Sequence, residues 1–432
     1  MFRHWLYKAG STLGPLRALR DRHRFLQKSQ YWSQKRLANH QAMLLGDLLR
    51  HAASTVPFYR RYWQDRGGAV LDPAGLQEWP IVDKATLREH FDEMCSEDPH
   101  PDFWEYATGG SSGTPVKLLI DKEVKKWRWA AKMRNLEWMG WQPGDEVAFI
   151  WGSDFDRKRT SDLATRVFRK LSGQVWLNTF RASEAEYVDF GRFLLRWRPR
   201  FLVGYASSLA TFVEICDHDR ELRELRFEGV QSSAEVLHEH HKERLRQRFG
   251  CGVFDLYGQR EVGNIAQNTV DDGPLLVNAE SLIVETVGEG EGSRIVATDL
   301  RNLSFPLIRY DTGDLGARVG KPSNESRALP CLGPITGRQA EMLTAPNGRL
   351  VHCEYFAHLF YGQQAVQRFQ LVVRGPKVVI RYQSRSSVDL APVVAAIHKD
   401  IDPSWSIETE RVDAFDSLAS GKHSYVVRED QQ

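Results

Sequence analysis

The chain has 432 residues, of which 42% are hydrophobic and 26% charged, and its formal net charge is +2 at pH 7. This length exceeds one ordinary folding unit, and the near-neutral charge argues against a general nucleic-acid binder. The sequence has no apolar run of the roughly 18 residues that span a membrane, no secretory signal, and five scattered cysteines without metal-ligand or redox spacing. We therefore expect a cytoplasmic globular protein of two or three folding units.

The first 36 residues are strongly basic. They carry nine lysines and arginines and a single acid, Asp21, with apolar side chains between them. Two interpretations stay open for the extension 1–29. It is either a basic amphipathic segment that makes a peripheral contact with an anionic membrane surface or a partner, or a solvated helix packed on its own domain.

Helical spacing of apolar residues predicts a helix over 30–66, with Pro57 near its end. Asp83 is placed to cap a further short helix. After a glycine-rich stretch, the pattern predicts a strand over 116–120 and a helix over 122–139.

The glycine-rich stretch reads Thr-Gly-Gly-Ser-Ser-Gly-Thr-Pro-Val-Lys. Its glycines let backbone N–H groups converge, and its hydroxyls and lysine add donors, which is how a loop binds phosphate. The alternative is a polar turn between two strands. The candidate phosphate-binding residues are Thr108, Gly109, Gly110, Ser111, Ser112, Gly113, Thr114 and Lys117.

Strands and helices then alternate. Strands are predicted at 147–152, 201–205, 229–233 and 253–257, and helices at 190–197, 208–218 and 236–249. This alternation predicts an α/β fold with a mostly parallel sheet flanked by helices. Ligands of such sheets bind at the carboxyl ends of the strands. The segments Ser233-Ala234-Glu235 and Tyr257-Gly258-Gln259-Arg260-Glu261 fall at two such ends.

The last third of the chain changes character. Strands are predicted at 282–287, 294–298 and 307–310, joined by turns rich in glycine and acids. Beyond residue 337, strands at 366–373 and 378–382 and a helix at 389–400 predict a small α+β domain. The expected division is a large domain over 1–336 and a small one over 337–432.

These segments, in this order, resemble the adenylate-forming superfamily of acyl- and aryl-CoA synthetases. The full set is 108–117, 233–235, 257–261, Ile308-Arg-Tyr-Asp-Thr-Gly-Asp314, Gly337-Arg338 and Ala419-Ser-Gly-Lys422. The stretches 48–59, 79–87 and 298–310 narrow the resemblance to the phenylacetate–CoA ligase branch, including its relatives in capsule polysaccharide biosynthesis. The resemblance covers about residues 30–425.

The resemblance implies the chemistry of the site. The family joins a carboxylate to ATP as an adenylate, where catalysis is positioning plus electrostatic stabilisation. By resemblance, the loop 108–117 holds the β- and γ-phosphates and Glu261 binds Mg²⁺. Ser233, Ala234, Glu235, Tyr257 and Gly258 line the adenine, Asp314 binds the ribose hydroxyls, and Lys422 bridges the attacking carboxylate and the α-phosphate.

The resemblance also implies a mobile C-terminal domain that carries Lys422 and turns about a hinge near 337–341, where Arg338 touches the ribose. The acyl pocket is expected at Trp151, Gly152 and Tyr205, although a core role is equally open for the two aromatic residues. The cofactors implied are ATP, Mg²⁺ and CoA.

Three departures from the family pattern matter. Arg260 stands where the family has threonine; it either contacts the α-phosphate or obstructs the site. The hinge aspartate after Arg338 is replaced by Gln-Ala-Glu. The stretch 265–276 offers no Cys/His set, so we expect no zinc.

We therefore expect an acid–thiol ligase that activates a carboxylic acid and passes the acyl group to CoA. The alternatives are transfer to a carrier protein or an amine, in a polysaccharide or secondary-metabolite pathway, and a degenerate member that binds nucleotide without turnover.

Overall fold

The computed structural model describes residues 15–64, 66–107, 116–151, 169, 172–179, 182–288, 292–317, 326–338, 342–347, 350–352, 356, 359, 366–374, 377–384, 387–413, 415 and 426–428. These residues form two compact units, which divide between Thr336 and Gly337. Four groups of predicted site residues lie outside the described part: Thr108–Thr114, Gly152, Lys422 and the side chain of Arg338.

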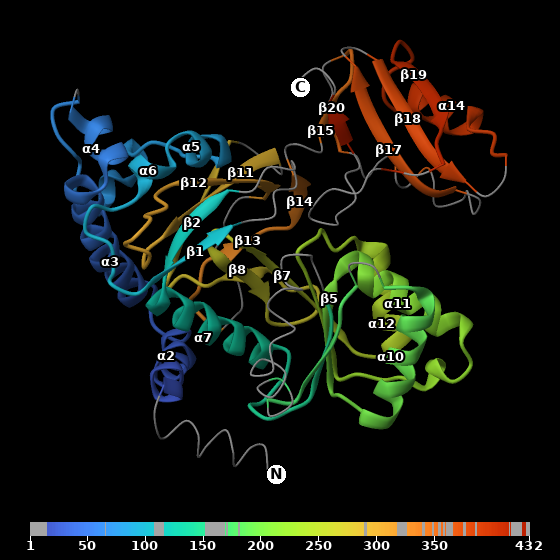
Figure 1. Ribbon diagram of the computed structural model, residues 1–432, viewed down its shortest axis with the longest axis horizontal. Coiled ribbons are helices and arrows are strands. Elements are labelled where there is room, and N and C mark those ends of the chain that lie inside the picture. The colour runs from blue at the N-terminus through green and yellow to red at the C-terminus, as the bar shows by residue number, and fades with distance from the viewer. Residues whose placement is uncertain are drawn as a thin grey trace. The chain divides into compact units, whose positions relative to one another are not determined.

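The described part of the first unit contains an eight-stranded sheet in the order β13–β9–β8–β7–β6–β5–β3–β4 (Figure 1). Its strands are β3 (Val147–Ile150), β4 (Gln174–Leu177), β5 (Phe201–Tyr205), β6 (Gly229–Ser233), β7 (Gly252–Gln259), β8 (Gly263–Asn268), β9 (Leu275–Val277) and β13 (Cys331–Leu332). The five strands from β4 to β7 run parallel, as predicted, and β8, β9 and β13 are antiparallel.

Helices cover both faces of the parallel part, which explains its continuous apolar strands. Leu202 of β5 packs in the cluster formed with α10 (Glu184–Trp197), α11 (Ala206–His218) and α12 (Glu239–Phe249). Its neighbours Phe201 and Val203 pack on the other face, with side chains of α7 (Lys122–Trp138). None of the described helices is long and apolar enough to cross a membrane.

A second, four-stranded sheet contains β10 (Leu282–Val287), β11 (Ser293–Asp299), β12 (Tyr310–Gly316) and β14 (Ile335–Arg338). It shares a core with α3 (Gln34–Thr55) and α4 (Pro57–Gln64). The single helix predicted over 30–66 is therefore two, because Pro57 lacks the N–H that would continue α3 and begins α4 instead.

The strand predicted at 307–310 is wrong in its position. Arg309 has φ +50°, in the left-handed region, so an extended strand cannot pass through it and β12 begins at Tyr310. The other short elements are η1 (Pro73–Glu78), α5 (Lys84–Glu89), α6 (Phe91–Met94), η2 (Leu222–Glu224), and the antiparallel pair β1 (Phe103–Ala107) and β2 (Lys117–Asp121).

The second unit is a small α+β structure. A sheet in the order β19–β18–β17–β20 packs its apolar face on α14 (Ala391–Asp400). Its strands are β17 (Val366–Arg374), β18 (Lys377–Ser384), β19 (Ser406–Arg411) and β20 (Val426–Arg428), and β15 (Met342–Thr344) pairs with β16 (Leu350–His352). The predicted strands over 366–373 and 378–382 and the helix over 389–400 are confirmed.

The described part of the basic extension is a helix, α2 (Pro15–Ser29), that packs on α7. Leu26 and His23 are buried, and Gln27 donates to Glu137 at 3.0 Å. The structure thus shows residues 15–29 packed on their own domain. Because the apolar face of α2 is buried, a membrane contact by this helix would depend on its exposed basic side chains.

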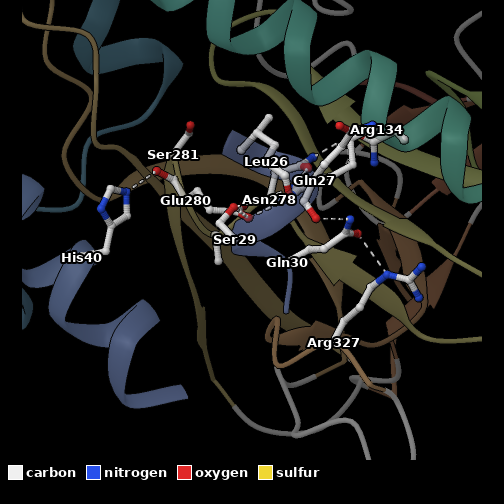
Figure 2. A network of polar contacts seen from close by, with 12 residues as sticks. Leu26, Gln27, Ser29, Gln30, His40, Arg134, Asn278, Glu280, Ser281 and Arg327 are labelled. Carbon is white, nitrogen blue, oxygen red and sulfur yellow. Dashed lines mark hydrogen bonds and ion pairs between the residues drawn. The ribbon is translucent and has the colours of Figure 1, made fainter. Parts of the chain in front are cut away.

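A buried ion pair anchors α2 and α7 to the segment before β10 (Figure 2). Arg134 of α7 and Glu280 have no exposed side-chain surface, and Nη1 of Arg134 lies 2.5 Å from Oε1 of Glu280. Ser29 also donates to Glu280, at 2.6 Å, and Arg134 donates to Asn278 at 2.7 Å. Burial alone would raise the pKa of Glu280, but the Arg134 charge and these hydrogen bonds outweigh it and lower the pKa.

We expect Arg134→Met to lower the free energy of unfolding by about 3–5 kcal/mol, because it leaves the buried Glu280 carboxylate without its counter-charge. Urea unfolding followed by circular dichroism measures this. The matched control is Arg50→Met, which breaks the exposed pair with Asp47 and should cost no more than about 1 kcal/mol. Equal losses in the two variants would contradict the role of the buried pair.

The same pair predicts an acid dependence. A carboxyl group whose folded-state pKa is depressed stabilises the fold above its unfolded-state pKa of about 4.3 and loses that contribution as the pH falls through the folded value. Urea midpoints of the natural chain should therefore fall below pH 4.3. The urea midpoint of the double variant Arg134→Met/Glu280→Leu should fall less over the same pH range. An equal fall of the midpoint in both chains would contradict the prediction.

Candidate active site

Three neighbouring parallel strands bring the predicted residues together at their carboxyl ends. Tyr205 at the end of β5 is paired with Ser233 at the end of β6, and Ser233 with Leu256 of β7. The chain leaves each strand there, so Tyr205, Ser233–Glu235 and Tyr257–Glu261 share one edge of the sheet, as the sequence predicts.

The turn after β6 is held in a fixed shape. The Ser233 hydroxyl donates to the carbonyl of Leu256 at 2.8 Å, and Ala234 has φ +68°. The Glu235 carboxylate accepts from the backbone N–H of Ser207 at 2.8 Å, in the first turn of α11. The positive end of that helix stabilises this carboxylate, so the Glu235 side chain serves as a helix cap.

Asp314 is the centre of a buried hydrogen-bonded cluster. Its Oδ2 accepts from the Tyr257 hydroxyl at 2.9 Å and from Nε2 of Gln259 at 2.6 Å. Gln259 also donates to the carbonyl of Thr312 at 2.7 Å, and the Thr312 hydroxyl donates to the carbonyl of Ile295 at 2.8 Å. These bonds join β12, which carries Asp314, to β7, and they fix the orientation of the carboxylate.

Sequence reasoning missed Gln259 and Thr312 as site residues. Both lie inside motifs that carry the family resemblance, and that was the available signal. Their role comes from bonds between β7 and β12, which the order of motifs along the chain does not show.

Glu261 is a buried carboxylate beside a cation. Its side chain is 4% exposed, and Nζ of Lys84 lies 3.4 Å from its Oε1. The buried Tyr310 lies near the same carboxylate. Burial, and then the negative charges of Glu261 and Asp314, hold the pKa of Tyr310 well above its usual value, so its hydroxyl keeps its proton.

Lys84 reaches Glu261 because β12 fixes the start of α5. The backbone N–H of Val82 donates to the carbonyl of Arg309 at 3.1 Å, and the N–H of Asp311 donates back to Val82 at 2.8 Å. Asp83 then caps α5 by accepting from the N–H of Thr86 at 2.8 Å, which confirms the predicted cap. Lys84 is the first residue of this helix. Sequence reasoning missed it as a site residue, although it lies in the stretch 79–87 that carries part of the family resemblance.

Arg128 of α7 holds the turn that carries Glu261. It donates to the carbonyls of Arg260 at 3.1 Å and Glu261 at 2.6 Å, and it pairs with Asp299 at 3.0 Å. Gly263, which closes the turn, has φ +85°, and a Cβ there would lie 2.9 Å from the Arg128 side chain. The close approach of Arg128 therefore requires glycine at 263.

The donor set at Glu261 is compatible with Mg²⁺. No group of three or more His, Cys, Asp or Glu side chains in the described part of the chain could hold an ion. A single carboxylate suits Mg²⁺, which keeps several waters and binds one or two carboxylates together with substrate phosphates. Glu261 fits this requirement. Because the ammonium group of Lys84 already lies beside this carboxylate, it would have to leave room for the ion.

Two predicted pocket residues lie side by side next to this edge. The rings of Trp151 and Tyr205 are 4.4 Å apart, and Tyr205 is 8% exposed. Trp151 follows directly after β3. The structure brings these aromatic residues together at the carboxyl ends of β3 and β5.

The chain is similar in sequence to curated phenylacetate–coenzyme A ligases. It is 23% identical to the one from Pseudomonas putida over 327 residues, which are 71% of this chain and 72% of that protein. It is 24% identical to the one from Thermus thermophilus over 351 residues, which are 76% of each chain. No protein-family model matches the chain.

The fold has solved counterparts. The structure of a 2-hydroxyisobutyryl-CoA ligase in the postadenylation state, in complex with 2-HIB-AMP, superposes with a TM-score of 0.66. It covers 90% of this chain and 89% of its own at 18% identity. The chain is therefore a distant sequence relative of the phenylacetate–CoA ligases and has the fold of the adenylate-forming ligases.

Proposed function

We propose that this protein is an acid–thiol ligase that activates a carboxylic acid with ATP as an acyl- or aryl-adenylate and then transfers the acyl group to CoA. The observation that supports this best is the Asp314 carboxylate, held by Tyr257 and Gln259 beside the backbone turn 233–235. A fixed, buried carboxylate that is bonded to Tyr257, on the strand next to the turn 233–235, is suited to a ribose and its attached base.

At the nucleoside end, Asp314 accepts hydrogen bonds from the ribose hydroxyls, since a carboxylate offers two acceptor oxygens. The turn 233–235 and Tyr257 line the adenine. The Tyr257 ring stays in place because its hydroxyl is bound to Asp314. These residues bind and orient the nucleotide, and none of them exchanges a proton with it.

At the phosphate end, Glu261 would hold Mg²⁺, which neutralises phosphate charge when it is bound. Arg128 fixes the backbone of Glu261 by donating to its carbonyl, and Lys84 supplies a positive charge beside the Glu261 carboxylate. The loop Thr108–Thr114 would hold the outer phosphates, and Lys422 would bridge the attacking carboxylate and the α-phosphate.

In the first step a carboxylate oxygen of the acid attacks the α-phosphorus. A P–O bond forms, the bond to the β-phosphate oxygen breaks, and pyrophosphate leaves. In the second step the CoA thiol attacks the adenylate carbonyl carbon, and AMP leaves with the carboxylate oxygen that it gained. A carrier-protein thiol or an amine would use the same second step, with a thioester or an amide as product.

ATP–pyrophosphate exchange dependent on a panel of carboxylic acids tests the first step. We expect exchange with at least one acid, and a loss of about 10- to 100-fold in kcat/KM for Asp314→Asn, because a charged hydrogen bond contributes about 1.5–3 kcal/mol. Glu97→Gln, which breaks an exposed pair with Arg60, is the matched control and should stay within about twofold.

Absence of exchange with every acid in the panel, together with no ATP binding by calorimetry, would remove the adenylation proposal. ATP binding without exchange would favour the nucleotide-binding alternative. Product analysis with CoA, a carrier protein and simple amines then identifies the acceptor.

Arg128→Met should raise the Mg²⁺ concentration needed for half-maximal exchange by about tenfold, because it releases the carbonyls that aim Glu261. Arg128→Lys, which keeps one donor group, should recover part of the effect. Arg200→Met is the control for a lost ion pair, since Arg200 binds Asp145 and Glu228 at the far ends of the strands. An equal shift in the control would show that Arg128 acts only through stability.

A further inference from the structure

A hollow of about 530 Å³ opens on the α10–α12 side of the first unit. It lies where the C-terminal end of α11, the short helix η2 and the second half of α12 meet. Its lining residues are Asp217, Arg223, Arg226, Arg244, Gln247 and Arg248. Four guanidinium groups thus face one carboxylate.

The single carboxylate, that of Asp217, already pairs with two of these arginines. Asp217 pairs through Oδ2 with Arg244 at 3.2 Å and through Oδ1 with Nε of Arg248 at 3.4 Å. Arg223 binds the main-chain carbonyl of Asp217, at 3.0 and 2.7 Å, and Arg226 donates to the carbonyls of Arg223 and Leu225. The charges of Arg223 and Arg226 are therefore held in place by neutral carbonyls.

Two acids that are close to the hollow in sequence pair with an arginine outside it. Asp219 and Glu221 pair with Arg192, at 3.5 and 3.3 Å. The negative ends of α11 and α12 favour some positive charge here, and this accounts for Arg223, which caps the last turn of α11. Each helix end provides about half an elementary charge, so the two ends and Asp217 together leave about two of the four positive charges unbalanced.

The Arg248 side chain is also held in a fixed orientation. Arg248 is 8% exposed and donates to the carbonyl of Leu222, so its guanidinium is fixed at the base of the hollow. A planar guanidinium that is already oriented loses little freedom on binding an anion, and its fork of N–H donors matches phosphate oxygens. The volume lies within the range of small-molecule sites.

We propose that this arginine hollow is a binding site for a phosphate group, separate from the nucleotide site. The exposed Arg226 and Arg244 contact the phosphate from the rim. Arg223, which is also exposed, adds positive charge beside them, and the Arg248 side chain, which is 8% exposed, adds positive charge at the base. The phosphate belongs either to a free phosphorylated metabolite or to the headgroup of an anionic lipid, which present the same chemistry to the site.

The hollow is not part of the candidate active site. The active-site edge lies at the start of α11, next to Tyr205, whereas Asp217 is eleven residues further along, about 17 Å at the rise of an α-helix. The hollow therefore sits toward the opposite ends of the parallel strands. Phosphate binding there does not depend on the proposed function, and it can be measured in the absence of ATP and acid.

Calorimetric titration of the full chain with inorganic phosphate at constant chloride tests the proposal. We expect binding that weakens at least tenfold in Arg226→Gln/Arg244→Gln, a change of about 1.4 kcal/mol. Arg50→Gln/Arg66→Gln removes two exposed charges elsewhere in the first unit and should bind like the natural chain. Asp217→Asn should bind phosphate more tightly, because it removes the competing carboxylate.

Any phosphate bound at the glycine-rich loop would be unchanged by these substitutions, so the difference between the paired variants reports on the hollow. Equal affinity in Arg226→Gln/Arg244→Gln and its control, or no binding by the natural chain at millimolar phosphate, overturns the proposal. Sedimentation with phosphatidylglycerol vesicles identifies the source: a lipid headgroup gives vesicle binding that the same double variant loses, and a free metabolite gives phosphate binding alone.

Discussion

The candidate site depends most on the hydrogen bonds that Arg128 donates to the turn after β7. One guanidinium binds the carbonyls of Arg260 and Glu261 and the carboxylate of Asp299, and so connects α7, the turn and β11. A turn between strands would otherwise be the most mobile part of such a site. Binding its backbone lets Glu261 keep its direction, while its side chain, which is 4% exposed, pairs with Lys84.

The helix α7 performs this task because it is itself fixed at a second point. Six residues after Arg128, Arg134 is buried against Glu280 and joins α7 to α2 and to the segment before β10. Two buried or half-buried arginines on one helix are costly to desolvate, so each needs a carboxylate and additional acceptors. The structure provides both sets: Glu280 and Asn278 for Arg134, and Asp299 with the carbonyls of Arg260 and Glu261 for Arg128.

Much of the fold could be predicted from the sequence, and less of the site. Alternating apolar runs and helical spacing located β5, β6 and α14 because those patterns depend on local geometry. The position of β12 was missed because the left-handed backbone of Arg309 is stabilised by tertiary contacts with the carbonyls of Gln77 and Trp79. Lys84 and Arg128 were missed for the same reason: their partners lie more than 130 residues away in the chain.

The central claim, that the protein makes an acyl-adenylate, has one direct test. The chain is incubated with ATP, CoA and an acid that supports exchange, with both carboxylate oxygens of the acid labelled with ¹⁸O, and the nucleotide products are analysed by mass spectrometry. Attack at the α-phosphorus predicts AMP that carries one ¹⁸O atom and unlabelled pyrophosphate. Label in inorganic phosphate, with ADP as the nucleotide product, would show attack at the γ-phosphorus and would contradict the account.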